Sequence, residues 1–205
     1  MAFFQKSFTT AIAPKEKSTI NKEDYLNPTS LDPAGGTARM HVLSESPETG
    51  FELWFQTATG NPVPRRVPGN PDQALIAELE AEIGGSLVVR DGRPAIKQFA
   101  AFFVWDYDFE RVRIFSATQK QILQPLARLT EDPDYAELSD WDIQLTRNGR
   151  DLDTKYAVDM KPTKRKGSLD AKITAAWAEA QSNGADLAGL FIPGANPMGG
   201  RSAAE

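Results

Sequence analysis

The sequence predicts a mainly β protein with added helices, built around a small closed barrel of about five strands. Two strand-like runs, one helix and two more strand-like runs follow one another between Phe103 and Met160 with little spare sequence. This order, with a helix between the late strands, is typical of a barrel of the oligonucleotide-binding (OB) type. A further helical pattern near the C-terminus adds a helix outside the barrel.

The first two strands of this unit form a predicted hairpin. The run Lys97 to Asp106 is dense in β-branched and aromatic residues, and the run Arg111 to Phe115 alternates between polar and apolar residues up to Ile114. The polar stretch Tyr107 to Glu110 separates the two runs and supplies the turn.

A helix is predicted next, because apolar residues recur at the spacing of one helix face, at Ile122, Leu123, Leu126 and Leu129. Ser116 or Thr118 offers a side-chain oxygen to cap its start. Pro125 lies inside the run, and we expect it to kink or interrupt the helix.

The last two strands of the unit are Trp141 to Thr146, which alternates, and Lys155 to Met160. Asn148-Gly149 between them is a favoured tight-turn pair, because both residues tolerate positive φ. Earlier in the chain, Phe51 to Phe55 reads as a short strand with one buried face. Trp54 lies on the opposite side of that strand from its neighbours and could reach a groove.

Two amphipathic patterns predict helices around the barrel. Asp72 to Ile83 places four apolar side chains on one face, at Leu75, Ile76, Leu79 and Ile83. Asp170 to Ser182 does the same and stops at Asn183-Gly184, so we expect it to pack on the barrel. Its apolar face consists of Ile173, Ala176, Trp177 and Ala180.

We therefore expect one folded unit with appendages. Residues 1–27 are polar and aperiodic and form a flexible N-terminal arm, and residues 28–160 form the OB-like domain. Residues 161–192 form a basic linker and the C-terminal helix, and the glycine- and proline-rich residues 193–205 form a disordered tail.

Composition excludes several classes of function. The chain has no cysteine, so disulfides, thiol catalysis and iron-sulfur clusters are excluded, and no glycine-rich loop precedes Lys-Ser or Lys-Thr as a Walker-type site requires. No apolar run is long enough to cross a bilayer, and Met1-Ala2-Phe3-Phe4 is not followed by a secretory hydrophobic core. We expect a cytoplasmic protein, in the host cell cytoplasm if it is phage-encoded.

The formal net charge is -5, so the chain as a whole is not basic. Its cations are nevertheless clustered, at Arg65-Arg66, Arg111 with Arg113, Arg147 with Arg150, and Lys161 to Lys166. A local stripe of cations is sufficient for phosphate binding, because affinity comes from local counterion release.

Alternation along the predicted hairpin places two cations, Lys97 and Arg113, on an aromatic face. If Phe102, Val104, Val112 and Ile114 fill the barrel, the outer surface carries Lys97, Phe99, Phe103, Trp105, Tyr107, Arg113 and Phe115. Cations interleaved with flat rings suit a single-stranded nucleic acid, because bases stack on the rings and the cations follow the phosphates. The alternative is that Phe99, Phe103 and Phe115 are buried against the N- or C-terminal extension.

Three stretches of the chain carry a family resemblance: Thr118 to Ile122, Asp140 to Gly149, and Leu152 to Val158. They resemble phage single-stranded DNA-binding proteins of the helix-destabilising type, in which an arginine, a glycine turn, a threonine and a tyrosine follow the helix. Arg147, Gly149, Thr154 and Tyr156 stand in those places. The resemblance implies an OB-like fold that coats single-stranded DNA in replication, recombination and repair, without chemistry and without a cofactor.

The chain departs from that family in two ways. Many members carry a zinc loop of cysteines and a histidine, whereas this chain has only His41, so such a site is excluded and the helix from Asp72 to Ile83 is its apolar substitute. Many also end in an acidic tail that recruits replication proteins, whereas this tail holds Arg201 and only Glu205.

The N-terminal arm of the family associates copies along the strand. A second copy and replication proteins are thus candidate partners, and no membrane partner is expected.

We predict a non-catalytic, largely sequence-independent protein that binds single-stranded DNA. The candidate nucleic-acid-binding residues are Trp54, Arg65, Arg66, Lys97, Phe103, Trp105, Tyr107, Arg113, Arg147, Lys155, Tyr156 and Lys161. An OB-type adaptor for a protein or RNA partner is the alternative. A metal-dependent nuclease has a weaker basis, in Asp106, Asp108 and Glu110 around a hairpin turn.

Overall fold

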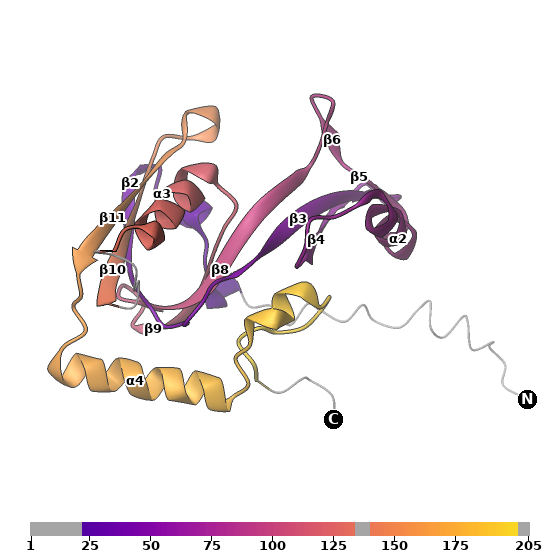
Figure 1. Cartoon of the computed structure of the whole chain (residues 1–205). Coiled ribbons are helices and arrows are strands. Elements are labelled where there is room, and N and C mark those ends of the chain that lie inside the picture. The colour runs from indigo at the N-terminus through magenta and orange to yellow at the C-terminus, as the bar shows by residue number, and fades with distance from the viewer. Residues whose placement is uncertain (1–21, 134–139, 201–205) are drawn as a thin grey trace, which may run out of the picture.

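The computed structural model describes residues 22–133 and 140–200 (Figure 1). Within these residues the protein is mainly β with three added α-helices, as the sequence predicts. Short 3-10 helices complete it: η1 (Lys22–Asp24), η2 (Pro28–Ser30), η4 (Asp151–Asp153) and η5 (Leu187–Phe191).

One large sheet organises the molecule. Its strands follow the path β1 (Tyr25–Leu26), β9 (Arg111–Ala117), β8 (Ile96–Asp106), β2 (Ala34–Val42), β10 (Trp141–Asn148) and β11 (Lys155–Pro162). A branch adds β3 (Glu48–Thr57), which pairs with β8, with β4 (Pro62–Val67) and with β5 (Gly85–Leu87). A separate small hairpin consists of β6 (Val89–Arg90) and β7 (Arg93–Pro94).

The path is open, so the predicted closed barrel is not formed. The path ends at β1 and at β11, and no pairing joins these two edges among the described strands; β1 itself pairs in parallel with β9. The helix α3 (Lys120–Glu131) packs against β11 instead. The strand order β8, β9, α3, β10, β11 is nevertheless the order that the sequence predicts.

The strand β8 joins two parts of the molecule. Its residues 104–106 pair with β2, and its residues 96–101 pair with β3. Figure 1 shows β3 and β8 running together from the part that holds α3 to the part that holds α2 (Gln73–Ile83). The β6–β7 hairpin projects beyond that sheet.

Each helix covers its own apolar cluster. The helix α3 contributes Ile122 and Leu126 to a core with β2, β8 and β10. The helix α4 (Gly167–Ser182) covers the other face of β8 and β9 through Ile173 and Ala180. The helix α2 contributes Leu79 to a third cluster, against β3.

The helix boundaries follow local chemistry. Asp72 caps α2 by accepting a hydrogen bond of 2.8 Å from the Leu75 N–H, and Gly84 ends it at φ 64°. The helix α4 starts three residues before the predicted Asp170 and ends at Ser182, with Asn183 as its C-cap, as predicted. The helix α3 runs through Pro125 without interruption. Ser116 lies within β9, which extends to Ala117, and the N-cap is Gln119 rather than Thr118.

The connection between β10 and β11 is longer than a two-residue turn. Gly149 has φ +83°, and a Cβ there would lie 2.3 Å from the Asp153 carbonyl oxygen. The short helix η4 then completes the turn, with Asp151 also at positive φ.

The predicted ends need two corrections. The N-terminal arm lies outside the described residues up to Asn21, but residues 22–27 contain η1 and β1. Of the tail predicted to be disordered, residues 193–200 fold back on the C-terminal helix: the Gly200 N–H donates to the Asn183 carbonyl at 2.8 Å, and Met198 packs on the cluster under α4. Residues 201–205 lie outside the described residues. No helix in the described part is long and apolar enough to cross a membrane.

Candidate nucleic-acid interface

A groove of about 530 Å³ lies where β3, β4 and β8 meet the β6–β7 hairpin and the start of α3. Trp54 is its one aromatic lining residue. The charged lining consists of four cations and one carboxylate: Arg66, Arg90, Arg93, Lys97 and Glu52. Polar side chains from η2, β9 and the segment before α3 complete it: Asn27, Thr29, Ser116, Thr118 and Gln119. The groove combines one ring with an excess of positive charge.

Strand alternation explains why these side chains meet. Leu53 and Phe55 are fully buried against α2, so Glu52 and Trp54 face the other side of β3. Across the sheet, Glu52 lies opposite Arg66 of β4 and opposite Lys97 of β8. The register of these three neighbouring strands therefore places one cation on each side of the Glu52 carboxylate.

Glu52 and Arg66 hold this row together. The Glu52 Oε1 accepts a hydrogen bond of 3.0 Å from the Trp54 indole N–H, and Oε2 accepts from Arg66 Nη2 at 2.9 Å. Arg66 also donates to Ser116 Oγ at 3.1 Å, and its guanidinium lies 4.5 Å from the centroid of the Phe99 ring. The ring of Trp54 and the guanidinium of Arg66 are thus fixed by neighbours before any ligand arrives.

Arg90 and Arg93 were absent from the sequence-predicted site. They flank the turn Asp91-Gly92, where both residues have positive φ, 50° and 72°, as a tight hairpin turn requires. The sequence signal was present, because Asp-Gly is a strong hairpin pair and an arginine stands on each side of it. Both side chains are exposed.

Of the twelve predicted site residues, the groove brings together Trp54, Arg66 and Lys97. Three more lie at the turn end of the β10–β11 hairpin, beside elements that line the groove. Arg147 donates to the carbonyl of Leu31 at 2.9 Å and to that of Thr29. The Tyr156 N–H donates to Oε1 of Gln121, in the first turn of α3, at 2.8 Å, and Lys155 is exposed beside it.

Arg65 lies on the opposite face of β4 from Arg66. Its guanidinium is 3.6 Å from a carboxylate oxygen of Glu82, on α2. Sequence neighbours in a strand point to opposite sides, so the Arg65-Arg66 pair could not serve one ligand. Only Arg66 lines the groove.

The prediction that β8 carries an exposed aromatic surface is wrong. Phe103 and Trp105 are only 4% and 1% exposed, because α4 covers them. The Phe103 ring lies 5.0 Å from that of Trp177, centroid to centroid. The alternative interpretation, in which the C-terminal extension buries Phe99 and Phe103, is confirmed. Trp105, expected to stack bases, belongs to the same cluster.

The assignment of Arg113 and Phe115 to that face is also wrong. The register pairs Val104 with Arg113 and Phe102 with Phe115, so these residues share the α3 side of the sheet. Arg113 is 8% exposed, and its Nη1 donates to Asp106 at 2.8 Å. Its other nitrogens donate to backbone carbonyls of Glu23 and Tyr25, so Arg113 fixes η1 and β1 to the sheet.

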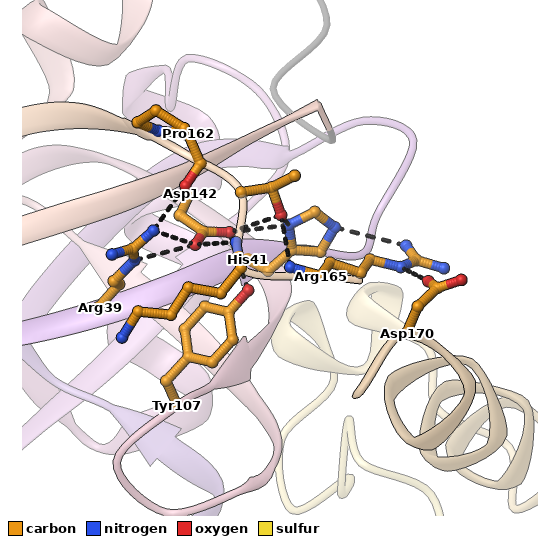
Figure 2. Close-up of polar contacts among 9 residues, drawn as sticks. Arg39, His41, Tyr107, Asp142, Pro162, Arg165 and Asp170 are labelled. Atoms are coloured by element: carbon orange, nitrogen blue, oxygen red, sulfur yellow. Dashed lines mark hydrogen bonds and ion pairs between the residues drawn. The ribbon is translucent and has the colours of Figure 1, made fainter. Parts of the chain in front are cut away.

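Tyr107 belongs to a buried polar cluster around Asp142 (Figure 2). The Tyr107 hydroxyl donates to Asp142 Oδ1 at 2.9 Å, and Arg39 Nη2 lies 2.7 Å from Oδ2. His41 Nδ1 is 3.1 Å from Oδ1, and Arg165 Nη1 is 3.4 Å from Nε2. A guanidinium can only donate, so Nε2 accepts and Nδ1 carries the proton given to Asp142.

Lys161 lies opposite Asp142 in the β10–β11 pair and does not line the groove.

The cluster shifts the acidity of two groups. Burial raises the pKa of Tyr107 well above its ordinary value, and the hydrogen bond to Asp142 raises it further. Burial also opposes ionisation of Asp142, but hydrogen bonds from His41, the Lys164 N–H, Arg39 and Tyr107 outweigh it, so the pKa of Asp142 is lowered. The ionised Asp142, on β10, joins β2 and Tyr107, the residue after β8, to the segment that leads into α4.

In the acidic turn considered for a nuclease, Asp106 makes contacts within the protein. Asp106 is buried, pairs with Arg113 at 2.8 Å and accepts the N–H of Asp108 at 2.9 Å. In the described part of the chain, no group of three or more histidine, aspartate or glutamate side chains is arranged to hold a metal ion.

Comparison of the chain with protein-family models, with curated proteins and with solved structures finds no match in any of the three.

Proposed function

We propose that this protein binds single-stranded DNA, without chemistry and largely without regard to sequence, in the groove around Trp54. The observation that carries the proposal is the convergence of Trp54 with Arg66, Arg90, Arg93 and Lys97. A base that stacks on an aromatic ring gains roughly 1–3 kcal/mol whatever its identity. The surrounding cations follow the phosphates, which carry no sequence information.

The net charge of -5 does not oppose this proposal. Binding to phosphates depends on the local excess of cations, and the groove has four against one carboxylate. Acidic side chains gather elsewhere, for example at Glu78, Glu80 and Glu82 on α2, which packs on the opposite face of β3.

The strand order supports an OB-like unit as part of the proposal. In such folds, single strands bind across the sheet between two loops. The β6–β7 hairpin and the β10–β11 hairpin flank β8, β9 and the start of α3 in this way (Figure 1). The resemblance to phage helix-destabilising proteins adds a role in DNA replication, recombination or repair, in the cytoplasm of a host cell. The same resemblance supports self-association along the strand.

The proposal is tested by titrating a fluorescent thymidine oligomer, a uridine oligomer and a matched DNA duplex with the protein, at several salt concentrations, and following anisotropy. Salt-sensitive binding to the DNA single strand in preference to the duplex supports it. Preference for the uridine oligomer would assign the groove to RNA. Absence of binding at low salt would overturn the proposal.

A protein-binding adaptor is the second candidate, and one observation favours it. A separate groove of about 640 Å³ lies between the β2–β3 loop, β8 and α3. Its lining is largely apolar and includes Leu43, Phe51, Phe99, Phe102, Leu123 and Leu126. This candidate predicts that oligonucleotides leave the tryptophan fluorescence unchanged.

A further inference from the structure

We infer that Glu52 is a positioning residue of the proposed groove: it fixes the ring of Trp54 and the guanidinium of Arg66 for the strand without binding the strand itself. This inference rests on the proposed function. By its charge alone, Glu52, the one carboxylate that lines the groove, should weaken the binding of phosphates. The inference is that Glu52 strengthens binding instead.

The two oxygens of Glu52 serve two different partners. Oε1 accepts from the Trp54 indole N–H at 3.0 Å, and Oε2 accepts from Arg66 Nε at 3.1 Å and Nη2 at 2.9 Å. The indole has only one donor, so this bond fixes the edge of the ring. The face of the ring is left for a base.

Arg66 is held from three sides. Besides Glu52 it contacts Ser116 Oγ at 3.1 Å and lies over the Phe99 ring. Among the described residues, no hydrogen bond is found for Arg66 Nη1, so that nitrogen keeps its hydrogens for a phosphate oxygen. A guanidinium held in one orientation loses less side-chain entropy on binding.

The burial of Glu52 supports a role inside the protein. Its side chain is only 12% exposed and that of Arg66 is 19% exposed. Removing one partner of such a pair leaves the other without compensation. A carboxylate that acted only by repelling phosphate would lower the affinity for the strand. Glu52 instead orders the Trp54 ring and the Arg66 guanidinium, the two groups that the proposed ligand contacts.

The two interpretations predict opposite signs for Glu52→Ala. If Glu52 acts only through its charge, its removal raises affinity for a thymidine oligomer and steepens the salt dependence. If Glu52 positions the ring and the guanidinium, affinity falls by about threefold to tenfold, part of the stacking contribution of one base. Affinity equal to or higher than that of the parent would overturn the inference.

Glu82→Ala is the matched control. Glu82 pairs with Arg65 at 3.6 Å on the opposite face of the same strands, so the variant loses the same charge and also releases an arginine. We expect it to bind as the parent does. Thermal unfolding of each variant gives the folded fraction.

Glu52→Gln separates the two partners and keeps the shape of the side chain. Its amide oxygen still accepts from the Trp54 N–H, but its amide nitrogen cannot accept from Arg66. We expect the quenching of Trp54 by a saturating thymidine oligomer to match the parent in Glu52→Gln and to fall in Glu52→Ala. Equal quenching in the two variants would contradict the positioning of Trp54.

A measurement on the free protein distinguishes failure of this inference from failure of the proposed function. The difference in fluorescence between each protein and its Trp54→Phe counterpart isolates Trp54 from the other tryptophans. We expect acrylamide to quench that signal more strongly in Glu52→Ala than in the parent. If it does and no oligomer binds the parent, the proposed function fails while the positioning stands; an unchanged signal overturns the positioning itself.

Discussion

Arg90 and Arg93 lie directly opposite each other across the β6–β7 hairpin, at the rim of the groove that holds Trp54. Like charges at directly opposed strand positions destabilise a hairpin. In the proposed function, the negative charge of a bound phosphate relieves this repulsion.

Replacing Arg90 or Arg93 by alanine should weaken binding to every single-stranded sequence alike. Each lost phosphate contact lowers the slope of log affinity against log salt by about 0.7, the value for single strands. The measurement is anisotropy with thymidine and mixed-sequence oligomers at four salt concentrations. The thermal stability of the protein should not fall, because a repulsive pair is removed.

Arg128→Ala controls for the loss of a positive charge, because Arg128 is exposed on α3 and does not line the groove. It should leave the slope nearly unchanged. Equal slopes for Arg90→Ala, Arg93→Ala and the parent would place the phosphates elsewhere.

Trp54→Ala should lower affinity by roughly 1–3 kcal/mol, the range for loss of one stacked base, with little change in the salt slope. The same titration measures both quantities. Phe109→Ala is the control, since Phe109 is 62% exposed but does not line the groove. An equal loss in both variants would mean that any exposed ring contributes, and that the groove has no special role.

Trp105→Ala should destabilise the fold without acting on the strand directly. Trp105 is 1% exposed beneath α4, and truncating a buried tryptophan costs about 3–5 kcal/mol. Chemical denaturation measures the loss. Once affinity is corrected for the folded fraction, we expect it to match the parent; a specific loss of binding in a fully folded variant would restore the aromatic face of β8 as a binding surface.

The ion pairs of Asp142 should make stability depend on pH below neutrality. The pKa of Asp142 is lowered in the folded protein from the ordinary value of 3.8, so its contribution is complete above that value and is lost as pH falls through the folded pKa. Asp142→Asn should therefore be less stable than the parent at pH 7, by about 3–5 kcal/mol for a broken buried pair. The difference between the two proteins should shrink below about pH 4. A difference independent of pH would contradict the ionised state of Asp142.

Local patterns predicted the elements well. The four apolar residues of α2 meet β3 as their spacing predicts, and Asp72 and Gly84 bound that helix. Alternation also separated Phe103 and Trp105 correctly from Phe102 and Val104. The side chains that share a face of a strand can be predicted from the sequence because the period of the pleat is fixed.

What covers each face could not be predicted in the same way. The face of Trp105 is buried by Ile173 and Trp177, which lie about seventy residues later in the chain, and alternation within one strand carries no information about such contacts. Arg113 was placed on the wrong face because the register between β8 and β9 depends on the turn that joins them. The opposition of Arg90 and Arg93 was readable from the Asp-Gly pair, but the contact of their hairpin with Trp54 depends on the long-range pairing of β3 with β8.

The most direct test of the groove is photo-crosslinking of the protein to a single-stranded oligomer that carries 5-iodouracil, followed by identification of the modified peptides. The groove predicts crosslinks at Trp54 and in the β6–β7 hairpin, and their loss in Trp54→Ala. Crosslinks confined to α4, or to the face of β4 that carries Arg65, would contradict it.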